Sequence, residues 1–257
     1  MSTAHTPPAE QTGTELLTSM WERNYLPLTG EIISGFSLAD DARCLDLGAG
    51  GGGMSHWLAE RVPRGSVTAL DTDVSQIDPT RSPNLTVVRG DLTEADFAPG
   101  SFDLVLARAV LASVPDPDAA VAAAARWLAP GGTLLVEDFY FLPAEDAPSE
   151  AARSVVRAYL EGFRTGGVDV RWARRLPATL ARVGLADIGA RVTPLGPGQS
   201  PQESELIATR LRLQGRPLVD SGLATEDDIA EFTAGLDRPE DRDVTTLLFS
   251  TWGKRRG

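Results

Sequence analysis

Apolar residues recur along the chain at two spacings, one typical of buried strands and the other of helices. Short, continuous apolar runs predict strands of a parallel sheet, because such strands are covered on both faces. Five such runs precede residue 140: Arg43–Leu47, Ser66–Leu70, Leu85–Arg89, Phe102–Ala107 and Thr133–Glu137. Helical spacing between them, as at Gly52–Arg61 and Asp116–Leu128, predicts crossover connections. We therefore expect a doubly wound α/β domain.

The segments on either side of this core are expected to be mainly helical. Thr14–Leu38 has helical spacing interrupted at Pro27, which predicts one or two helices that pack on the following domain. Later helices and strands are expected at Pro148–Gly184, Asp187–Thr193 (strand), Glu203–Gln214, Thr225–Leu236 and Asp243–Trp252 (strand). No linker separates independent domains. We predict a helical segment over residues 1–37 and a single domain over residues 38–257.

Composition and charge exclude several functional classes. A single cysteine, Cys44, rules out an internal disulfide, and with only His5 and His56 the chain offers no metal-ligand spacing, so no metal is expected. The formal net charge of −12, without a basic stripe, argues against nucleic-acid binding. Neither a secretory signal nor an apolar run long enough to span a bilayer is seen, so we expect a cytoplasmic protein without a membrane partner.

A glycine-rich turn follows the first predicted strand and opens the first crossover helix. Residues 44–53 read CLDLGAGGGG. At the carboxyl end of a parallel strand, such a loop lets the backbone approach a ligand, and the free N–H groups of the helix end face it. The sequence therefore predicts a ligand-binding site at this turn.

Two ligands compete for the turn. Gly48, Gly50 and Gly53 satisfy the dinucleotide fingerprint, which alone is a weak signal. Asp46, however, precedes the first glycine by two residues, and a pyrophosphate gains nothing from its negative charge, whereas a ligand with an ammonium and a sulfonium does. The alternative for Asp46 is that it only holds the turn by hydrogen bonds.

Acidic residues also follow the second and third predicted strands. Asp71, after Ser66–Leu70, can accept hydrogen bonds from both hydroxyls of a ribose, with Thr72 beside it. Asp91 can accept from an adenine amino group while Leu92 packs on the ring, or Asp91 can simply close an Asx turn. Asp73 is expected to have a capping role.

The ordered segments CLDLGAGGGG, VTALD, RGDL, FDLVLARAVL and LAPGGTLLVEDF resemble the class I S-adenosylmethionine-dependent methyltransferases, and most closely those that act on small molecules in actinobacterial natural-product pathways. The resemblance covers about residues 38–140 well and the rest loosely. It implies a Rossmann-like, doubly wound, seven-stranded and mostly parallel sheet with an antiparallel last strand and helical cap insertions. It also implies the cofactor S-adenosyl-L-methionine.

The resemblance further implies roles for individual residues. Gly48, Ala49 and Gly50 would line the methionine part of the cofactor, and Asp71, Asp91 and Leu92 would hold the ribose and adenine. Arg108 and Ala109 would lie beside the cofactor, although Arg108 could instead pair with Asp91 or Asp103. Tyr25 would close over the methionine carboxylate.

No catalytic residue stands out, since methyl transfer from a sulfonium needs mainly alignment of donor and acceptor. Many relatives carry a histidine near the position of Ser113, and this chain has none there. At the end of the fifth predicted strand, Glu137, Asp138 and Tyr140 are candidates for a catalytic residue, and Asp138 and Tyr140 are kept as weak ones. The alternative for Asp138 is a surface or capping role. His56 is expected on a solvated helix surface.

Insertions at about 139–184 and 196–242 are the expected substrate walls. Their aromatic residues are Phe139, Tyr140, Phe141, Phe163, Trp172 and Phe232. The cluster of Arg171, Arg174 and Arg175 is either a solvated helix face or a site for an anionic substrate.

The sequence thus predicts methyl transfer to a small-molecule acceptor, on oxygen, nitrogen or carbon, in secondary metabolism. The alternatives are a cyclase or a non-methylating binding protein on the same scaffold and, more remotely, a nicotinamide-dependent oxidoreductase. The acceptor atom and substrate are not determined by the sequence, which also leaves a homodimer open.

Overall fold

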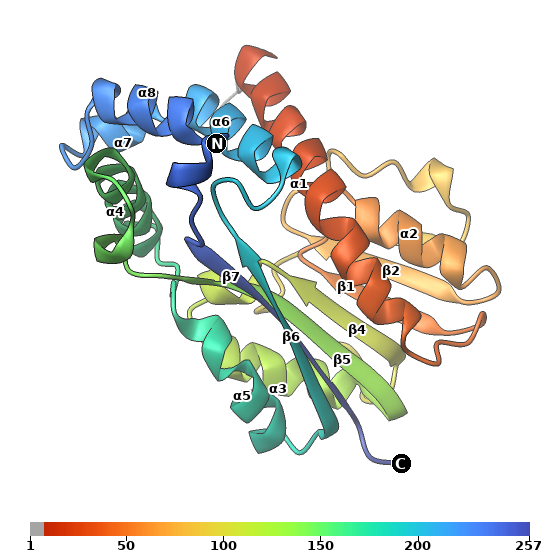
Figure 1. Ribbon diagram of the computed structural model, residues 1–257. Helices are drawn as coiled ribbons and strands as arrows, with labels where there is room; N and C mark the ends of the chain where they lie inside the picture. Colours follow the sequence, from red (N-terminus) through yellow and green to blue (C-terminus); the bar gives the residue numbers. More distant parts are fainter. Residues whose placement is uncertain (1–7) are drawn as a thin grey trace.

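The computed structural model describes residues 8–257, with side chains from residue 13 onward. A seven-stranded sheet forms the centre, in the order β3-β2-β1-β4-β5-β7-β6 (Figure 1). Its strands are β1 Arg43–Leu47, β2 Ser66–Asp71, β3 Leu85–Arg89, β4 Phe102–Arg108, β5 Leu128–Phe141, β6 Ala186–Leu195 and β7 Thr246–Lys254. The first five pair in parallel, and β7 runs antiparallel to both β5 and β6. The predicted mostly parallel sheet with a reversed last strand is therefore confirmed.

Helices cover both faces of the sheet. α1 (Pro8–Ser34) and α2 (Gly53–Arg61) pack on one face, and α3 (Pro117–Trp127) and α5 (Leu176–Arg182) pack on the other. The alternation within β4 explains how one strand serves both layers: Leu104 and Leu106 join the core under α2, whereas Val105 and Ala107 join the core under α3. Continuous apolar runs are thus the sequence signature of this three-layer arrangement.

A further group of helices gathers at one end of the sheet (Figure 1). These are α4 (Glu150–Thr165), α6 (Pro201–Gln214), α7 (Arg216–Asp220) and α8 (Glu226–Gly235). Their own small core contains Val155, Ala158, Leu211 and Leu218. Short 3₁₀ turns complete the chain at Pro79–Arg81, Leu111–Ser113, Ala144–Asp146, Trp172–Arg175 and Pro239–Asp241. We call α4, α6, α7 and α8 the cap.

The structure refines the predicted elements at three places. α1 continues through Pro27 as one helix, because apolar residues on both sides of the proline, such as Tyr25 and Ile32, are buried and outweigh the lost hydrogen bond. β5 already begins at Leu128, which pairs with Phe102 before the strand resumes its register at Thr133. The segment between α6 and α8, for which no element is predicted, contains the short helix α7.

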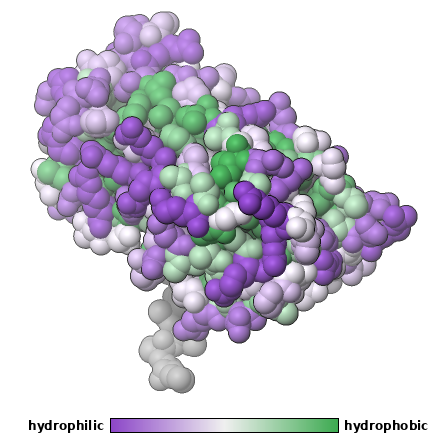
Figure 2. All heavy atoms as spheres, turned by 90° about the horizontal axis from the view of Figure 1, so that it is seen from below, coloured by the Kyte–Doolittle hydropathy of each residue, from purple (hydrophilic) through white to green (hydrophobic). Residues whose placement is uncertain are grey.

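Figure 2 shows a surface on which hydrophilic residues dominate and hydrophobic residues form patches between them. Within residues 13–257, the large hydrophobic side chains that are well exposed are Leu16, Val192, Leu213 and Leu223. Over residues 8–257, no helix combines the length and the apolar character needed to cross a membrane.

Candidate functional site

The glycine loop between β1 and α2 adopts a backbone that favours glycine at three positions. Gly48, Gly50 and Gly52 have φ values of 70°, 54° and 81°, in the left-handed region. A Cβ atom on Gly48 would lie 2.8 Å from the Val110 side chain, and one on Gly52 would lie 2.9 Å from Ile77. Gly50 has nothing within 4 Å of that position. The loop is therefore packed on two sides and open at Gly50, where it lines a cavity.

Asp71, at the end of β2, is bonded directly to this loop. Its Oδ2 accepts the backbone N–H of Gly50 at 2.8 Å, and its Oδ1 accepts the N–H of Asp73 at 3.0 Å. Thr72 only donates a long bond to the same carboxylate and does not line the cavity. Asp73 caps the following turn by accepting the N–H of Ser75, as expected. Of this acidic segment, Asp71 alone lines the cavity.

Two more carboxylates surround the loop. Asp46 is buried and accepts a 2.6 Å hydrogen bond from the Ser55 hydroxyl, and burial raises the pKa of its carboxyl. Glu22, on α1, accepts the N–H of Gly53 at 2.9 Å and so satisfies the first turn of α2. Asp46, Glu22 and Asp71 all line the cavity and give its loop side a negative potential.

Arg108 supplies the opposite charge on the same side. Its Nε donates to Glu137 at 3.1 Å, and its Cζ lies 4.8 Å from the centroid of the Trp21 ring. Its Nη2 is buried and has no hydrogen-bond partner within residues 13–257. The alternative pairing of Arg108 with Asp91 or Asp103 is wrong, because Asp103 is bonded to Arg43 at 3.0 Å and Asp91 to Thr93 at 2.7 Å.

Glu137 is fixed from three sides and does not line the cavity. Besides Arg108, it accepts hydrogen bonds from the hydroxyls of Thr29 on α1 and Ser250 on β7. This buried cluster holds α1 against β5 and β7, and one guanidinium nitrogen of Arg108, Nη2, is buried beside it without a hydrogen-bond partner among residues 13–257.

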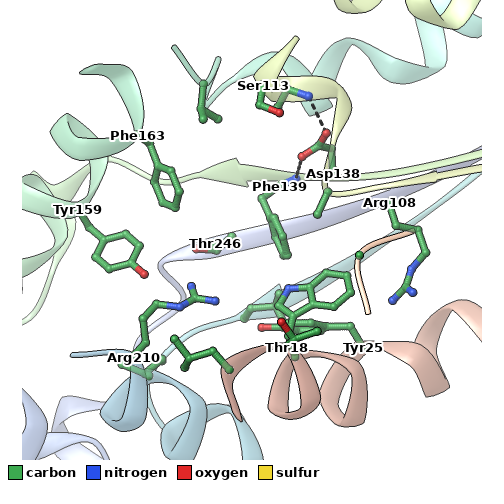
Figure 3. A pocket seen from close by; sticks show the side chains of 18 of the residues that line it. Thr18, Tyr25, Arg108, Ser113, Asp138, Phe139, Tyr159, Phe163, Arg210 and Thr246 are labelled. Atoms are coloured by element: carbon green, nitrogen blue, oxygen red, sulfur yellow. Dashed lines mark hydrogen bonds between the residues drawn. The ribbon is translucent and has the colours of Figure 1, made fainter. Parts of the chain in front are cut away.

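The cavity has a volume of about 670 Å³ and extends from the glycine loop to the cap (Figure 3). Eight residues expected near the cofactor line it: Tyr25, Asp46, Gly48, Ala49, Gly50, Asp71, Arg108 and Ala109. Ala109 has a φ of 50°, an uncommon backbone for alanine, directly after β4. The structure thus brings together, at one end of the sheet, residues that are up to 84 positions apart in the sequence.

Three other expected residues lie outside the cavity wall: Thr72, Asp91 and Leu92. The exposed Asp91 carboxylate accepts both the N–H and the hydroxyl of Thr93, at 2.8 and 2.7 Å, which is the Asx turn given as the alternative. Leu92 packs against the core under α3. Asp91 nevertheless lies at the same sheet edge as Asp71, because Asp71 pairs with Arg89 in the parallel register.

The Tyr25 hydroxyl does not face open space. It donates to Glu203 on α6, with a shorter distance of 2.8 Å to Oε2, and its ring packs edge-on against Trp21 and Phe139. Burial raises the pKa of Tyr25 and also that of Glu203. Tyr25 therefore joins α1 to the cap, and the expected closure over a carboxylate conflicts with the neighbouring Glu203.

Asp138 and Tyr140 occupy different surroundings. Asp138 is buried, lines the cavity, and accepts the backbone N–H groups of Ala112 and Phe139 at 2.8 and 2.9 Å (Figure 3). Burial raises its pKa to about 6, so a surface role for Asp138 is wrong. Tyr140 packs in the core against Phe249, with ring centroids 6.1 Å apart, and does not reach the cavity. Asp138 alone of this pair can contact a substrate.

His56 is buried rather than solvated. Its Nδ1 lies 3.0 Å from the Ser82 hydroxyl, and burial lowers the pKa of the ring. The expected surface position is wrong because helix α2 is covered on this side by the segment around Ser82. His56 does not line the cavity.

The cap side of the cavity is largely apolar. Four of the six expected aromatic residues line it: Phe139, Phe141, Phe163 and Phe232. Trp172 is fully buried in the core. Arg171, Arg174 and Arg175 lie outside the cavity, and Arg175 pairs with Asp169 at 2.7 Å. The arginine cluster is thus a surface feature rather than a wall of this cavity.

Several cavity residues are missed by the sequence reasoning. Trp21 and Glu22 lie in the amino-terminal helix, where helical spacing accounts for Trp21 as packing and carries no signal for Glu22. Arg210 and Glu203 lie on α6 of the cap. Spacing cannot identify them because their meeting with α1 depends on how the cap closes over the sheet.

The chain matches one protein family by sequence. Residues 45–136 match the family described as "Methyltransferase domain". Over 99 residues it is 35% identical to a trans-aconitate 2-methyltransferase of Deinococcus radiodurans, a match covering 37% of each chain. It is 28% identical over 201 residues to methyltransferase GfsG of Streptomyces halstedii, covering 71% of this chain and 68% of that protein. With methyltransferase str3 of Strobilurus tenacellus it shares 26% identity over 66% of this chain and 62% of the relative.

Solved structures resemble the whole fold. A phosphoethanolamine N-methyltransferase 2 of Haemonchus contortus, in complex with S-adenosylhomocysteine and phosphomonomethylethanolamine, superposes with a TM-score of 0.59 at 17% identity, covering 95% of this chain and 53% of that chain. The [4+2]-cyclase SpnF superposes with a TM-score of 0.60 at 17% identity, covering 90% and 80% of the two chains. At this identity the likeness concerns the fold.

Proposed function

The chain has the fold and the domain of the class I S-adenosylmethionine-dependent methyltransferases, whose cofactor is S-adenosylmethionine, and from this premise we propose that it methylates a small, largely apolar molecule. The observation that carries the proposal is the charge pattern of the loop side of the cavity. Three carboxylates, those of Asp46, Glu22 and Asp71, surround the glycines, and one buried guanidinium N–H group of Arg108 has no partner within residues 13–257.

Three carboxylates and one guanidinium on the loop side fit a ligand that carries both positive and negative charge. When bound, S-adenosylmethionine supplies a methyl group made electrophilic by a sulfonium, next to an amino acid group that carries an ammonium and a carboxylate. We assign the carboxylate to Arg108 and the cationic groups to the side of Asp46 and Glu22, since opposite charges attract strongly in a partly dry site. A pyrophosphate, in contrast, would meet three carboxylates at this loop. This argues against the nicotinamide alternative.

The nucleoside part fits the neighbouring strand ends. We assign the ribose hydroxyls to Asp71, which is already oriented by Gly50, and the open side of Gly50 to the close approach of the ligand. Asp91 and Leu92, at the next strand end, remain the proposed adenine contacts. Helix α1, whose Trp21 and Glu22 line the cavity, is the proposed cover of the cofactor, and the cap is the proposed substrate wall.

The proposed acceptor side needs little acid–base chemistry. Its walls orient the acceptor and exclude water, which is the main contribution of a protein to a displacement on an activated methyl group. Asp138 is the residue proposed to anchor the acceptor or take its proton, because it is the buried carboxyl beside the apolar walls and its pKa of about 6 lies near neutrality. Secondary metabolism is the proposed setting, supported by the similarity to the Streptomyces methyltransferase GfsG.

One second function is favoured by a specific observation. The fold is similar to that of a [4+2]-cyclase, and the apolar cap side of this cavity, which no histidine of residues 13–257 lines, suits a reaction that needs shape more than proton transfer. In this second function the cofactor site would be kept, but no methyl group would be transferred.

Calorimetry and product analysis test the proposal. We expect S-adenosylhomocysteine to bind the full chain with micromolar affinity and NADH to give no heat. Incubation with S-adenosylmethionine and a panel of apolar phenols, acids and amines should release S-adenosylhomocysteine with at least one acceptor. Heat with NADH alone would overturn the cofactor assignment, whereas binding without methyl transfer to any acceptor would favour the cyclase.

A further inference from the structure

One cation lies on the apolar side of the cavity. Arg210, on cap helix α6, lines the cavity, and its Cζ lies 6.0 Å from the centroid of the Tyr159 ring on α4. Figure 3 shows its guanidinium pointing into the cavity, away from α6. The surrounding walls include Phe163 and Ile207, so the charge is held where water is partly excluded.

The donors around this cation have no acceptor. Among residues 13–257, the Arg210 guanidinium forms no ion pair or hydrogen bond, and the hydroxyls of Tyr159 and Thr246, which line the same cavity, form none either. Glu203 lies two turns before Arg210 on α6, and both of its carboxylate oxygens accept from the Tyr25 hydroxyl, at 3.1 and 2.8 Å. A guanidinium and two hydroxyls thus face the cavity as donors, and Glu203 interacts electrostatically with Arg210 but is hydrogen-bonded to Tyr25 rather than to the guanidinium.

We propose that the substrate is a largely apolar molecule with a carboxylate group and that Arg210 binds this carboxylate. This inference rests on the proposed function. Arg210 is half-buried, and a partly desolvated guanidinium without a hydrogen-bond partner favours an anion, because the hydration that it has lost is otherwise not replaced. The planar fork of arginine matches a carboxylate with two parallel hydrogen bonds. The apolar walls contact the apolar part of the substrate, and Arg210 fixes its orientation by binding the carboxylate on the cap side of the cavity.

The charge count favours a carboxylate over a phosphate. The cap side offers one guanidinium, since Arg108 lies on the loop side and pairs with Glu137, and the exposed cluster at residues 171–175 lies outside the cavity. Because Glu203 lines the same wall and interacts electrostatically with Arg210, a phosphate dianion would be compensated even less than a singly charged carboxylate.

Matched pairs of acids and amides test the proposal in the full chain saturated with S-adenosylhomocysteine. The probes are 2-naphthylacetate, 4-phenylbutyrate and decanoate, each compared with its primary amide by calorimetry. We expect at least one acid to bind about tenfold or more tightly than its amide, the increment of a charge-assisted hydrogen bond. Arg210→Gln should reduce this preference to within about twofold without weakening the amide, and Arg210→Lys should restore part of it.

Arg212→Gln is the matched control, because Arg212 is exposed on the same helix and does not line the cavity. It should retain the full preference. The proposal is overturned if no acid is preferred over its amide by the wild type, or if Arg210→Gln keeps the preference. Separate titration of S-adenosylhomocysteine distinguishes the failures: loss of that binding contradicts the proposed function, whereas intact binding without acid preference contradicts only the role of Arg210.

Discussion

The Asp71 carboxylate accepts the backbone N–H of Gly50 at 2.8 Å, and this bond joins the end of β2 to the loop that follows β1. The two residues are 21 positions apart, and the parallel pairing of Leu47 with Leu70 brings them together. Asp71 therefore orients the glycine loop while one side of its carboxylate faces the cavity.

Replacement of Asp71 by alanine should weaken cofactor binding without unfolding the chain. Two hydrogen bonds from the ribose and the bond that orients Gly50 would be lost, and we expect a loss of about tenfold to a hundredfold in affinity for S-adenosylhomocysteine. Calorimetry measures the affinity, and circular dichroism verifies the fold. Asp73→Ala is the control, since Asp73 caps a turn outside the cavity and should leave the affinity unchanged. Equal affinity in Asp71→Ala would refute the ribose assignment.

A pair of glycine variants separates backbone strain from occupation of the site. Gly50 and Gly100 have φ values of 54° and 79°, and neither has an atom within 4 Å of an added Cβ. Alanine at either position should cost about 1 kcal/mol of stability, because both backbones are left-handed. Only Gly50→Ala should abolish measurable binding of S-adenosylhomocysteine, since Gly50 lines the cavity and Gly100 does not. Similar affinities for the two variants would show that no ligand approaches Gly50.

The strands could be predicted from the sequence because each depends on local pattern. Arg43–Leu47 and Leu85–Arg89 have the predicted bounds, because each is a short apolar run that turn residues end. Loop residues of the site follow from the same logic. Asp46, Gly48 and Asp71 lie at strand ends, and strand ends of a parallel sheet meet at one edge.

Residues whose partners come from distant elements could not be predicted. His56 has the spacing of a surface position on α2, and only the return of the chain near Ser82 buries it. Asp91 and Asp103 precede Arg108 in the sequence, yet Arg108 pairs with Glu137 because β4 and β5 are adjacent and the two residues lie opposite each other in their register. The role of Arg210 requires the position of the cap, which no periodicity encodes.

Removal of the Arg108 guanidinium should affect only ligands with an amino acid group. We expect the double variant Arg108→Met/Glu137→Gln, which leaves no buried charge unpaired, to bind S-adenosylhomocysteine about tenfold to a hundredfold more weakly. Its affinity for 5′-methylthioadenosine, which has the same nucleoside but no amino acid group, should change less than about twofold. Arg43→Met breaks the ion pair with Asp103 outside the cavity and is the control. A parallel loss for both ligands would contradict the carboxylate assignment.

Asp138 should titrate well above an ordinary aspartate. Burial raises its pKa from 3.8 to about 6, although the N–H groups of Ala112 and Phe139 stabilise the charged form. Because the folded chain holds this proton more tightly than the unfolded chain, the contribution of Asp138 to stability is greatest below the unfolded pKa and is lost as the pH rises through about 6. Carbon-13 spectra of aspartate-labelled protein should contain a carboxyl resonance with a midpoint near 6 that is absent from Asp138→Asn. In urea unfolding between pH 4 and 7, the free energy of unfolding of the wild type should therefore decrease with rising pH more steeply than that of Asp138→Asn. An unchanged titration in the variant would assign the midpoint to another carboxyl, such as Asp46, and would remove the basis for Asp138 as the residue that takes a proton from the acceptor near neutral pH.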